Sequence, residues 1–294
     1  MGTVSTTFIG GSRFYQSPDD HSITVPGVTS VLNMFPKGFL GPWNAKLAAE
    51  LAADMTTEGD LQRMVKRDRE GAVTYVKDAA KRYTKQAAEK GSEAHDLFER
   101  MIRGEELGPV STLMEPYVKH FDEFLSAVQP ELVSAEDVAW SDTHGYAGSY
   151  DAELLVKVDP ETGKLDQQGE AIRLMSDWKT GKNTYPDVAL QLSAYAYADR
   201  VISPDGSTRP MPTFDGGLVV HVTSEKWAAK PARVNEELHG VFLSALAFFH
   251  TVRQWEGEGW GRSRISGMKD DVIGKPIAKN APKRRVTGTE RRAK

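Results

Sequence analysis

Asp177 and Lys179 stand two residues apart inside an apolar stretch, in the segment SDWKTGK that runs from Ser176 to Lys182. Because side chains alternate across a β-strand, residues two apart point the same way, so this carboxylate and this ammonium share one face. Two interpretations fit such a pair. It is either a surface ion pair or half of a metal-dependent site that hydrolyses phosphodiester bonds.

A second acid is expected to lie close to Asp177. The preceding strand runs from Tyr150 to Val158, and the polar segment DPETGKLDQQGE joins it to the next. If Val158 lies opposite Glu170, then Asp151 lies opposite Asp177, although a connection this long leaves a slip of two residues open. Two carboxylates about 5 Å apart repel each other unless a cation lies between them, and Mg²⁺ and Mn²⁺ prefer carboxylate oxygens.

Three further side chains join this pattern. The segment KGSEAHDLFE places His95 on a helix, and QLSAYAYA places Gln191 and Tyr195 four residues apart on one helical face. Each has an ordinary structural interpretation, as a surface or core histidine and as a packed pair. Their order along the chain together with Asp151 and Asp177 makes the combination specific.

The motifs together resemble a known family. Gly-x-x-x-His at Gly91–His95, Gly-Ser-Tyr-Asp at 148–151, Asp-Trp-Lys-Thr-Gly at 177–181 and Gln-x-x-x-Tyr at 191–195 resemble the RecB-like branch of the PD-(D/E)XK nuclease superfamily. The sequence is most similar to phage-encoded exonucleases related to the CRISPR-adaptation nuclease. The resemblance covers residues 88–222 and, less closely, the segment 25–50.

The resemblance implies a metal site and a catalytic lysine. His95, Asp151 and Asp177 would bind a catalytic Mg²⁺ or Mn²⁺, together with the carbonyl of Trp178. The imidazole among oxygen ligands favours Mn²⁺, although Mg²⁺ is usually more available. Lys179 would position the attacking water and stabilise negative charge on the phosphate oxygens.

Other residues receive supporting roles from the same resemblance. Gln191 and Tyr195 would orient the lysine or hold the DNA backbone, and Lys182 is a candidate phosphate contact or else a solvated surface lysine. By position alone, Glu99, one turn after His95, is a candidate contact to a metal-bound water or else an exposed helix acid, and Glu153, on the same strand face as Asp151, is a candidate support for it. Many relatives carry cysteines for an iron–sulfur cluster, but this sequence has no cysteine, which excludes such a cluster here.

The charge of the chain is distributed unevenly. Residues 275–294 carry eight basic side chains and one acidic one, a net +7, which leaves −11 for the rest of a chain whose total is −4. A basic arm on an acidic body indicates an anionic partner such as DNA, with Lys283, Arg284 and Arg285 as candidate contacts, or else a solvated tail.

The pattern of residues changes along the chain. Up to about residue 128 it favours helices, including one over Trp43–Met55 and one that starts near Gly91 with Ser92 as its N-cap; two short strands are expected within residues 13–25. Strands then alternate with helices, which predicts an α/β fold. We expect a restriction-endonuclease-like core, a mixed sheet flanked by helices, at 89–260, after a hairpin and helical region at 1–88 and before a basic flexible tail at 261–294.

These expectations combine into a functional hypothesis. The sequence predicts a metal-dependent DNA exonuclease for phage DNA recombination, replication or processing, with DNA and a recombinase or single-strand-binding protein as partners. The alternatives are a catalytically silent DNA-end-binding or adaptor protein on the same fold and a structural phage component. No apolar run reaches the roughly 18 residues of a membrane span, and we expect the protein in the cytoplasm of the host cell.

Overall fold

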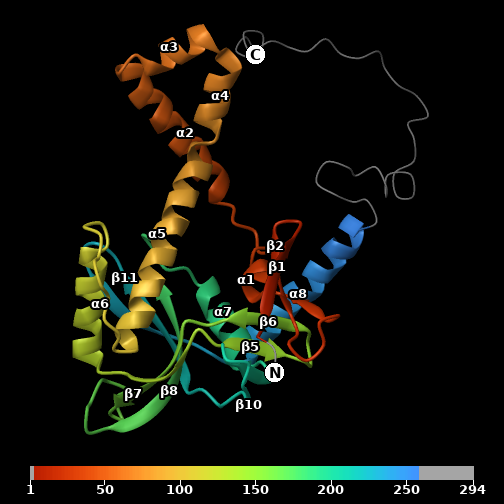
Figure 1. The fold of residues 1–294 in the computed structure, drawn as a ribbon, viewed down its shortest axis with the longest axis vertical. Helices are drawn as coiled ribbons and strands as arrows, with labels where there is room; N and C mark the ends of the chain where they lie inside the picture. The colour runs from red at the N-terminus through yellow and green to blue at the C-terminus, as the bar shows by residue number, and fades with distance from the viewer. Residues whose placement is uncertain (1–2, 258–294) are drawn as a thin grey trace. The chain divides into compact units, whose positions relative to one another are not determined.

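A mixed five-stranded sheet flanked by helices forms the centre of the structure (Figure 1), a computed structural model that describes residues 3–257. The strand order is β12-β11-β8-β7-β4, in which β11 and β8 are parallel and the other neighbours are antiparallel. The strands are β4 (Glu131–Ala135), β7 (Ala152–Val158), β8 (Glu170–Lys179), β11 (Gly216–Val222) and β12 (Trp227–Ala232). The predicted α/β class, with a mixed sheet, flanking helices and a helical N-terminal region, is confirmed.

Two smaller sheets accompany the main one. The first has the order β1-β2-β3 and contains the predicted pair of strands, since β2 and β3 are antiparallel neighbours. The second has the order β10-β9-β5-β6 and was not expected as a separate sheet. The strands are β1 (Ser5–Ile9), β2 (Ser12–Gln16), β3 (Thr24–Pro26), β5 (Val138–Ser141), β6 (Tyr146–Ser149), β9 (Arg200–Ile202) and β10 (Thr208–Pro210).

The helices follow the predicted pattern with one important correction. Helix α5 begins at Ala79 and runs unbroken to Ile102, so Ser92 is no N-cap and the expected boundary at residue 88 lies inside the helix. One glycine costs a helix only about 1 kcal/mol relative to alanine, too little to end it at Gly91. The helices are α1 (Val28–Leu32), α2 (Leu40–Thr57), α3 (Asp60–Arg67), α4 (Arg69–Lys77), α5 (Ala79–Ile102), α6 (Glu115–Val128), α7 (Asp187–Ala196) and α8 (Glu236–Gly257).

Aromatic side chains build the core between the sheet and helices α5 and α6. The rings of Phe98 and Phe121 lie 4.2 Å apart between centroids, and Trp178 meets Phe121 edge-on at 5.4 Å. All three rings are fully buried, and each contributes roughly 1.5–3 kcal/mol to folding. Burial of Trp178 on this face of β8 fixes Asp177 on the opposite face.

The register between β7 and β8 is the expected one. Val158 pairs with Glu170, and the pairing continues to Ala152 opposite Ser176. One step further along both strands brings Asp151 level with Asp177. The slip of two residues left open by the long connection does not occur.

The chain divides into two compact units, Met1–Leu246 and Ala247–Lys294. The residues discussed below lie in the first. The predicted basic tail at 261–294, with Lys283, Arg284 and Arg285, lies outside the described residues. Within residues 3–257, no helix has both the length and the apolar character that crossing a bilayer requires.

Candidate active site

One pocket brings together the six residues that the sequence motifs single out. His95 comes from α5, Asp151 precedes β7, Asp177 and Lys179 end β8, and α7 supplies the remaining two. The last two are Gln191 and Tyr195. Segments more than 80 residues apart in the sequence therefore converge on one place.

Asp177 is the most deeply buried acid of this pocket, with 3% of its surface exposed. Its Oδ1 accepts a hydrogen bond from Gln191 Nε2 at 3.0 Å, and its Oδ2 lies 2.5 Å from Lys179 Nζ. Oδ2 is buried and, within the described residues, accepts no well-directed hydrogen bond beside this ion pair. Burial and the charge of Asp151 raise the pKa of Asp177 to about 6, against the opposing effect of Lys179.

Asp151 connects the strand end to the helix. Its Oδ2 accepts the backbone N–H of Trp178 at 2.6 Å, and its Oδ1 lies 3.5 Å from His95 Nδ1. Burial alone would lower the pKa of His95, but the hydrogen bond to Asp151 and its charge outweigh burial, so the pKa is raised. The two carboxylates thus attract a proton on His95 and the ammonium of Lys179.

The donor atoms suit a hard cation, although the side chains are not arranged around one. Within residues 3–257, no group of three or more His, Asp or Glu side chains stands ready to hold a metal ion. Two facing carboxylates and a buried oxygen with only Lys179 beside it are nevertheless the oxygen set that Mg²⁺ or Mn²⁺ would take. Cation binding would therefore require Lys179 to leave Asp177 Oδ2.

Tyr195 contacts Gln191, the residue that donates a hydrogen bond to Asp177. Gln191 Nε2 also donates to Tyr195 Oη at 3.2 Å, and burial raises the pKa of this phenol, which stays protonated. With 2% of its surface exposed, Tyr195 is better placed to orient Gln191 than to touch DNA. A Cβ at Gly148 would lie 2.6 Å from the Tyr195 ring, which explains the glycine of the Gly-Ser-Tyr-Asp motif.

Glu136 also lines the pocket, and sequence reasoning missed it. Its backbone has φ +58, a left-handed conformation that is rare for residues other than glycine and is found disproportionately at functional sites. Burial, then Asp151 and Glu99, raise its pKa to about 7. Nothing in the segment EDVAWSD distinguished it from an ordinary acid at a strand end.

Glu99 and Glu153 differ from their expected roles. Glu99 lines the pocket but is engaged by Arg103 at 2.8 Å. Glu153 is completely buried and pairs with two arginines, Arg173 and, at 2.6 Å, Arg209. It therefore ties β7 to β8 and β10 and provides no direct support to Asp151.

A buried histidine, His221, contacts the turn that follows Lys179. His221 lies beside Lys179 in the parallel pair β11 and β8, and its Nε2 is 2.7 Å from the carbonyl of Gly181. Its Nδ1 is 3.1 Å from Lys230 Nζ, which can only donate, so Nδ1 accepts and Nε2–H donates to Gly181. Lys182, one residue later, is exposed and lies outside the pocket.

Comparisons with known proteins add little to this geometry. No family model matches the sequence, and no curated protein matches it. Among solved structures, one described as "Crystal structure of SSO0001" aligns over 65% of this chain and 70% of its own, with 11% identity and a TM-score of 0.29. A likeness this weak carries no argument about function.

Proposed function

We propose that the protein is a metal-dependent deoxyribonuclease, an exonuclease that hydrolyses phosphodiester bonds. The observation that carries the proposal is that Asp151, just before β7, and Asp177, near the end of β8, line one pocket with Lys179 2.5 Å from Asp177. Two acids and a lysine in one partly buried pocket would supply oxygen ligands for a cation and a positive charge beside them. The resemblance of the motifs to PD-(D/E)XK nucleases supports the same assignment.

Each residue then has a chemical task. Asp151, Asp177 and His95 would hold Mg²⁺ or Mn²⁺, which when bound polarises the phosphate and lowers the pKa of water. Lys179, with 34% of its side chain exposed, can leave Asp177 and stabilise the negative charge that builds on the phosphate oxygens. Gln191 keeps Asp177 oriented through its hydrogen bond to Oδ1.

The rival function is a silent DNA-end-binding or adaptor protein. It is favoured by the ion pair between Lys179 and Asp177 and by the absence, within residues 3–257, of three side chains arranged around a metal. The nuclease proposal predicts that a divalent ion breaks this pair. The rival predicts that the pair persists.

The test is cleavage of DNA labelled at either end, single- and double-stranded, by the wild type and by Lys179→Ala. We expect activity with Mn²⁺ at least equal to that with Mg²⁺, weak activity with Ca²⁺ and none with EDTA. Lys179→Ala should bind DNA normally and Mn²⁺ at least as tightly as the wild type, and cleave about 10² to 10³ times more slowly in a single turnover. Full activity in EDTA, or wild-type cleavage by Lys179→Ala, contradicts the proposal, and DNA binding without cleavage by either protein supports the adaptor.

The proposed activity also suggests its cellular setting. An exonuclease acting from a DNA end leaves a single strand, which a recombinase or single-strand-binding protein would then bind. We place this reaction in phage DNA recombination, replication or processing in the host cytoplasm. Pull-down of these two classes of protein with the DNA-loaded enzyme tests the partnership.

A further inference from the structure

Exposed aromatic rings and lysines gather beside the catalytic pocket. Two adjoining hollows share Lys182, Asn183 and Tyr185 from the loop after β8. One is lined by aromatic residues of α2 and α5 and of the segment before α2, the other by basic residues of β11, β12 and the turn between them. We call this region the loop surface and define it by Phe39, Tyr185, Lys182, Lys226 and Lys230.

The aromatic part of the loop surface presents stacked rings to solvent. Phe39 precedes α2 and Tyr185 precedes α7, yet their rings lie 5.5 Å apart between centroids and within 7° of parallel. Both side chains are about half exposed, Phe39 at 51% and Tyr185 at 50%. Exposed, parallel rings of this kind form a platform on which an unpaired base can stack.

The basic part of the loop surface lacks counter-charges. Lys182, Lys226, Lys230 and His221 line its hollow, and no acidic residue does so among residues 3–257. Within the same range none of the three lysines forms an ion pair; Lys230 Nζ is held by Thr184 Oγ1 at 3.0 Å and by His221. Two lysines with no carboxylate partner among the described residues, and a third whose ammonium is held by Thr184 and His221, lie beside an aromatic stack and match a chain of phosphates that carries bases.

The loop surface leads directly to the catalytic lysine. Lys182 and Tyr185 follow Lys179 by three and six residues. Thr180, directly after Lys179, packs against α5 at Gly91, where an added Cβ would lie 3.5 Å from Thr180 Oγ1. Gly91 itself lines the catalytic pocket. The same short loop therefore borders the pocket on one side and the stacked rings on the other.

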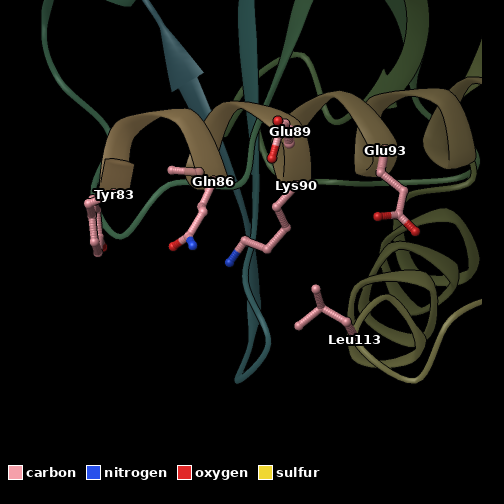
Figure 2. A pocket seen from close by; sticks show the side chains of 7 residues that line it. Tyr83, Gln86, Glu89, Lys90, Glu93 and Leu113 are labelled. Atoms are coloured by element: carbon pink, nitrogen blue, oxygen red, sulfur yellow. The ribbon is translucent and has the colours of Figure 1, made fainter. Parts of the chain in front are cut away.

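Another hollow along α5 has the opposite character. Figure 2 shows the side chains of Gln86, Lys90 and Glu93 on one side of α5, with Leu113 below the helix and Glu89 on the same stretch of helix. Its one lysine, Lys90, already donates to Tyr117 Oη at 2.8 Å. Two carboxylates and an engaged lysine disfavour phosphate, so a polyanion would follow the loop surface instead.

We propose that the loop surface binds a single-stranded segment of nucleic acid and guides it to the catalytic pocket. An unpaired base stacks on Phe39 and Tyr185 while phosphates lie on Lys182, Lys226 and Lys230. The proposal rests on the proposed function only for the destination of the strand, since the surface itself needs no catalysis. It commits to a nucleic acid because an acidic protein segment would use the lysines but not a parallel pair of exposed rings.

The test separates stacking from charge. Binding of a fluorescent oligothymidylate of about 15 nucleotides is measured by anisotropy in EDTA, beside a matched abasic strand with the same phosphates. Tyr185→Ala should weaken oligothymidylate binding about 10-fold and leave the abasic strand unaffected, while Tyr185→Phe binds like the wild type. Lys182→Ala combined with Lys226→Ala should weaken both strands and reduce the slope of log K against log salt by about 0.7 per contact.

A lysine at the other end of the sheet provides the matched control. Lys164 is exposed in the loop between β7 and β8, at the opposite end of β8 from Lys179, and Lys164→Ala should change neither affinity nor salt slope. The inference is overturned if Tyr185→Ala affects both strands equally, if Lys164→Ala matches the double lysine variant, or if a polyglutamate peptide competes as well as the oligothymidylate. If the wild type cleaves DNA but these binding changes are not seen, the loop-surface inference fails and the nuclease proposal stands. If the binding changes are seen but the wild type does not cleave DNA, the nuclease proposal fails and the loop-surface inference stands.

Discussion

Two buried acids on adjacent strands differ in how far neighbouring cations compensate their charge. Glu153 on β7 is fully buried and balanced by two arginines, Arg173 and Arg209. Asp177 on β8 is nearly as deep, with 3% of its surface exposed, yet it faces a second acid and has one lysine. The main sheet therefore holds one acid with its charge fully compensated and one whose pKa is raised to about 6.

The difference separates structure from chemistry. Removing a charge from water costs several kcal/mol unless partners replace the water, and Glu153 has those partners while Asp177 lacks them in part. Acids with strongly shifted pKa values are found preferentially at functional sites, because the chemistry there uses a charge that the fold compensates only in part. The predictions below test whether the two acids differ in this way.

The largest effect is expected at the under-compensated acid. Asp177→Asn should lower cleavage with Mn²⁺ by a factor on the order of 10³ or more, because it removes an anionic metal ligand. In EDTA its thermal midpoint should equal or exceed that of the wild type, because one of two facing charges is gone. Calorimetric Mn²⁺ titration and thermal unfolding measure both. A variant that cleaves normally, or that unfolds far more easily, would remove the contrast with Glu153.

The compensated acid should show the converse. Glu153→Gln leaves two arginines without their shared carboxylate and should lower the free energy of unfolding by about 2–3 kcal/mol, below the full cost of a broken buried pair because both arginines are partly solvated. Metal binding by the folded protein should be unchanged. Urea unfolding measures the loss, and Glu131→Gln on the neighbouring strand β4, where the side chain is exposed, is the control.

A third buried group, His239, extends the comparison, because burial favours its uncharged form. Burial lowers the pKa of His239 to about 4, and the nearby His144 adds to the shift while Asp199 opposes it. Between this value and the unfolded value of 6.5 the unfolded chain binds the extra proton, so the free energy of unfolding should fall as the pH is lowered. The expected loss between pH 7 and pH 5 is about 2 kcal/mol.

A conservative substitution isolates that titration. His239→Gln cannot take up a proton and can still donate to Tyr146 Oη, which His239 Nε2 reaches at 2.9 Å. Its unfolding free energy should change less between pH 7 and pH 5 than that of the wild type. The exposed His21, replaced by Gln in the same way, provides the control. Equal pH dependence in all three proteins contradicts the assignment.

The smallest effect is expected at His221, which contacts the turn at Gly181. His221→Phe removes the donor to the Gly181 carbonyl and should slow single-turnover cleavage about 10-fold, the effect of losing about 1.4 kcal/mol of positioning. Mn²⁺ affinity should stay the same, because no ligand is touched. His221→Gln, which can both donate to Gly181 and accept from Lys230, should recover most of the rate. A lost rate with no recovery would indicate a packing defect.

The part of this site that follows from strand alternation was predicted from the sequence. The alternation along β7 and β8, with Val158 assumed to lie opposite Glu170, predicted Asp151 level with Asp177 and left a slip of two residues open, and the structure has the assumed register. By contrast, the partners of His221 come from other elements, the turn at Gly181 and strand β12, so no spacing in the sequence identified its role. The left-handed backbone of Glu136 and the meeting of Phe39 with Tyr185 depend on tertiary packing in the same way.

Short elements explain the misses in the fold. Strands β9 and β10 of the β10-β9-β5-β6 sheet have three residues each, too few for a period to emerge from the sequence. At Gly91 the opposite error occurred, since a strong local signal predicted a helix start where 24 residues of helix are continuous. The sum of good helix formers on both sides outweighs one glycine.

Because helix α5 is unbroken, it could transmit a displacement from one end to the other. Tyr83 borders the loop surface and His95 the catalytic pocket, and 12 residues of helix between them span about 18 Å. If the rod pivots where Gly91 meets Thr180, a rotation of a few degrees displaces its ends in opposite directions by several tenths of an ångström, comparable to the roughly 0.5 Å tolerance of a catalytic constellation. Helix α2 packs on α5, with Trp43 against Tyr83, so a displacement of α2 would be transmitted along the same helix to His95.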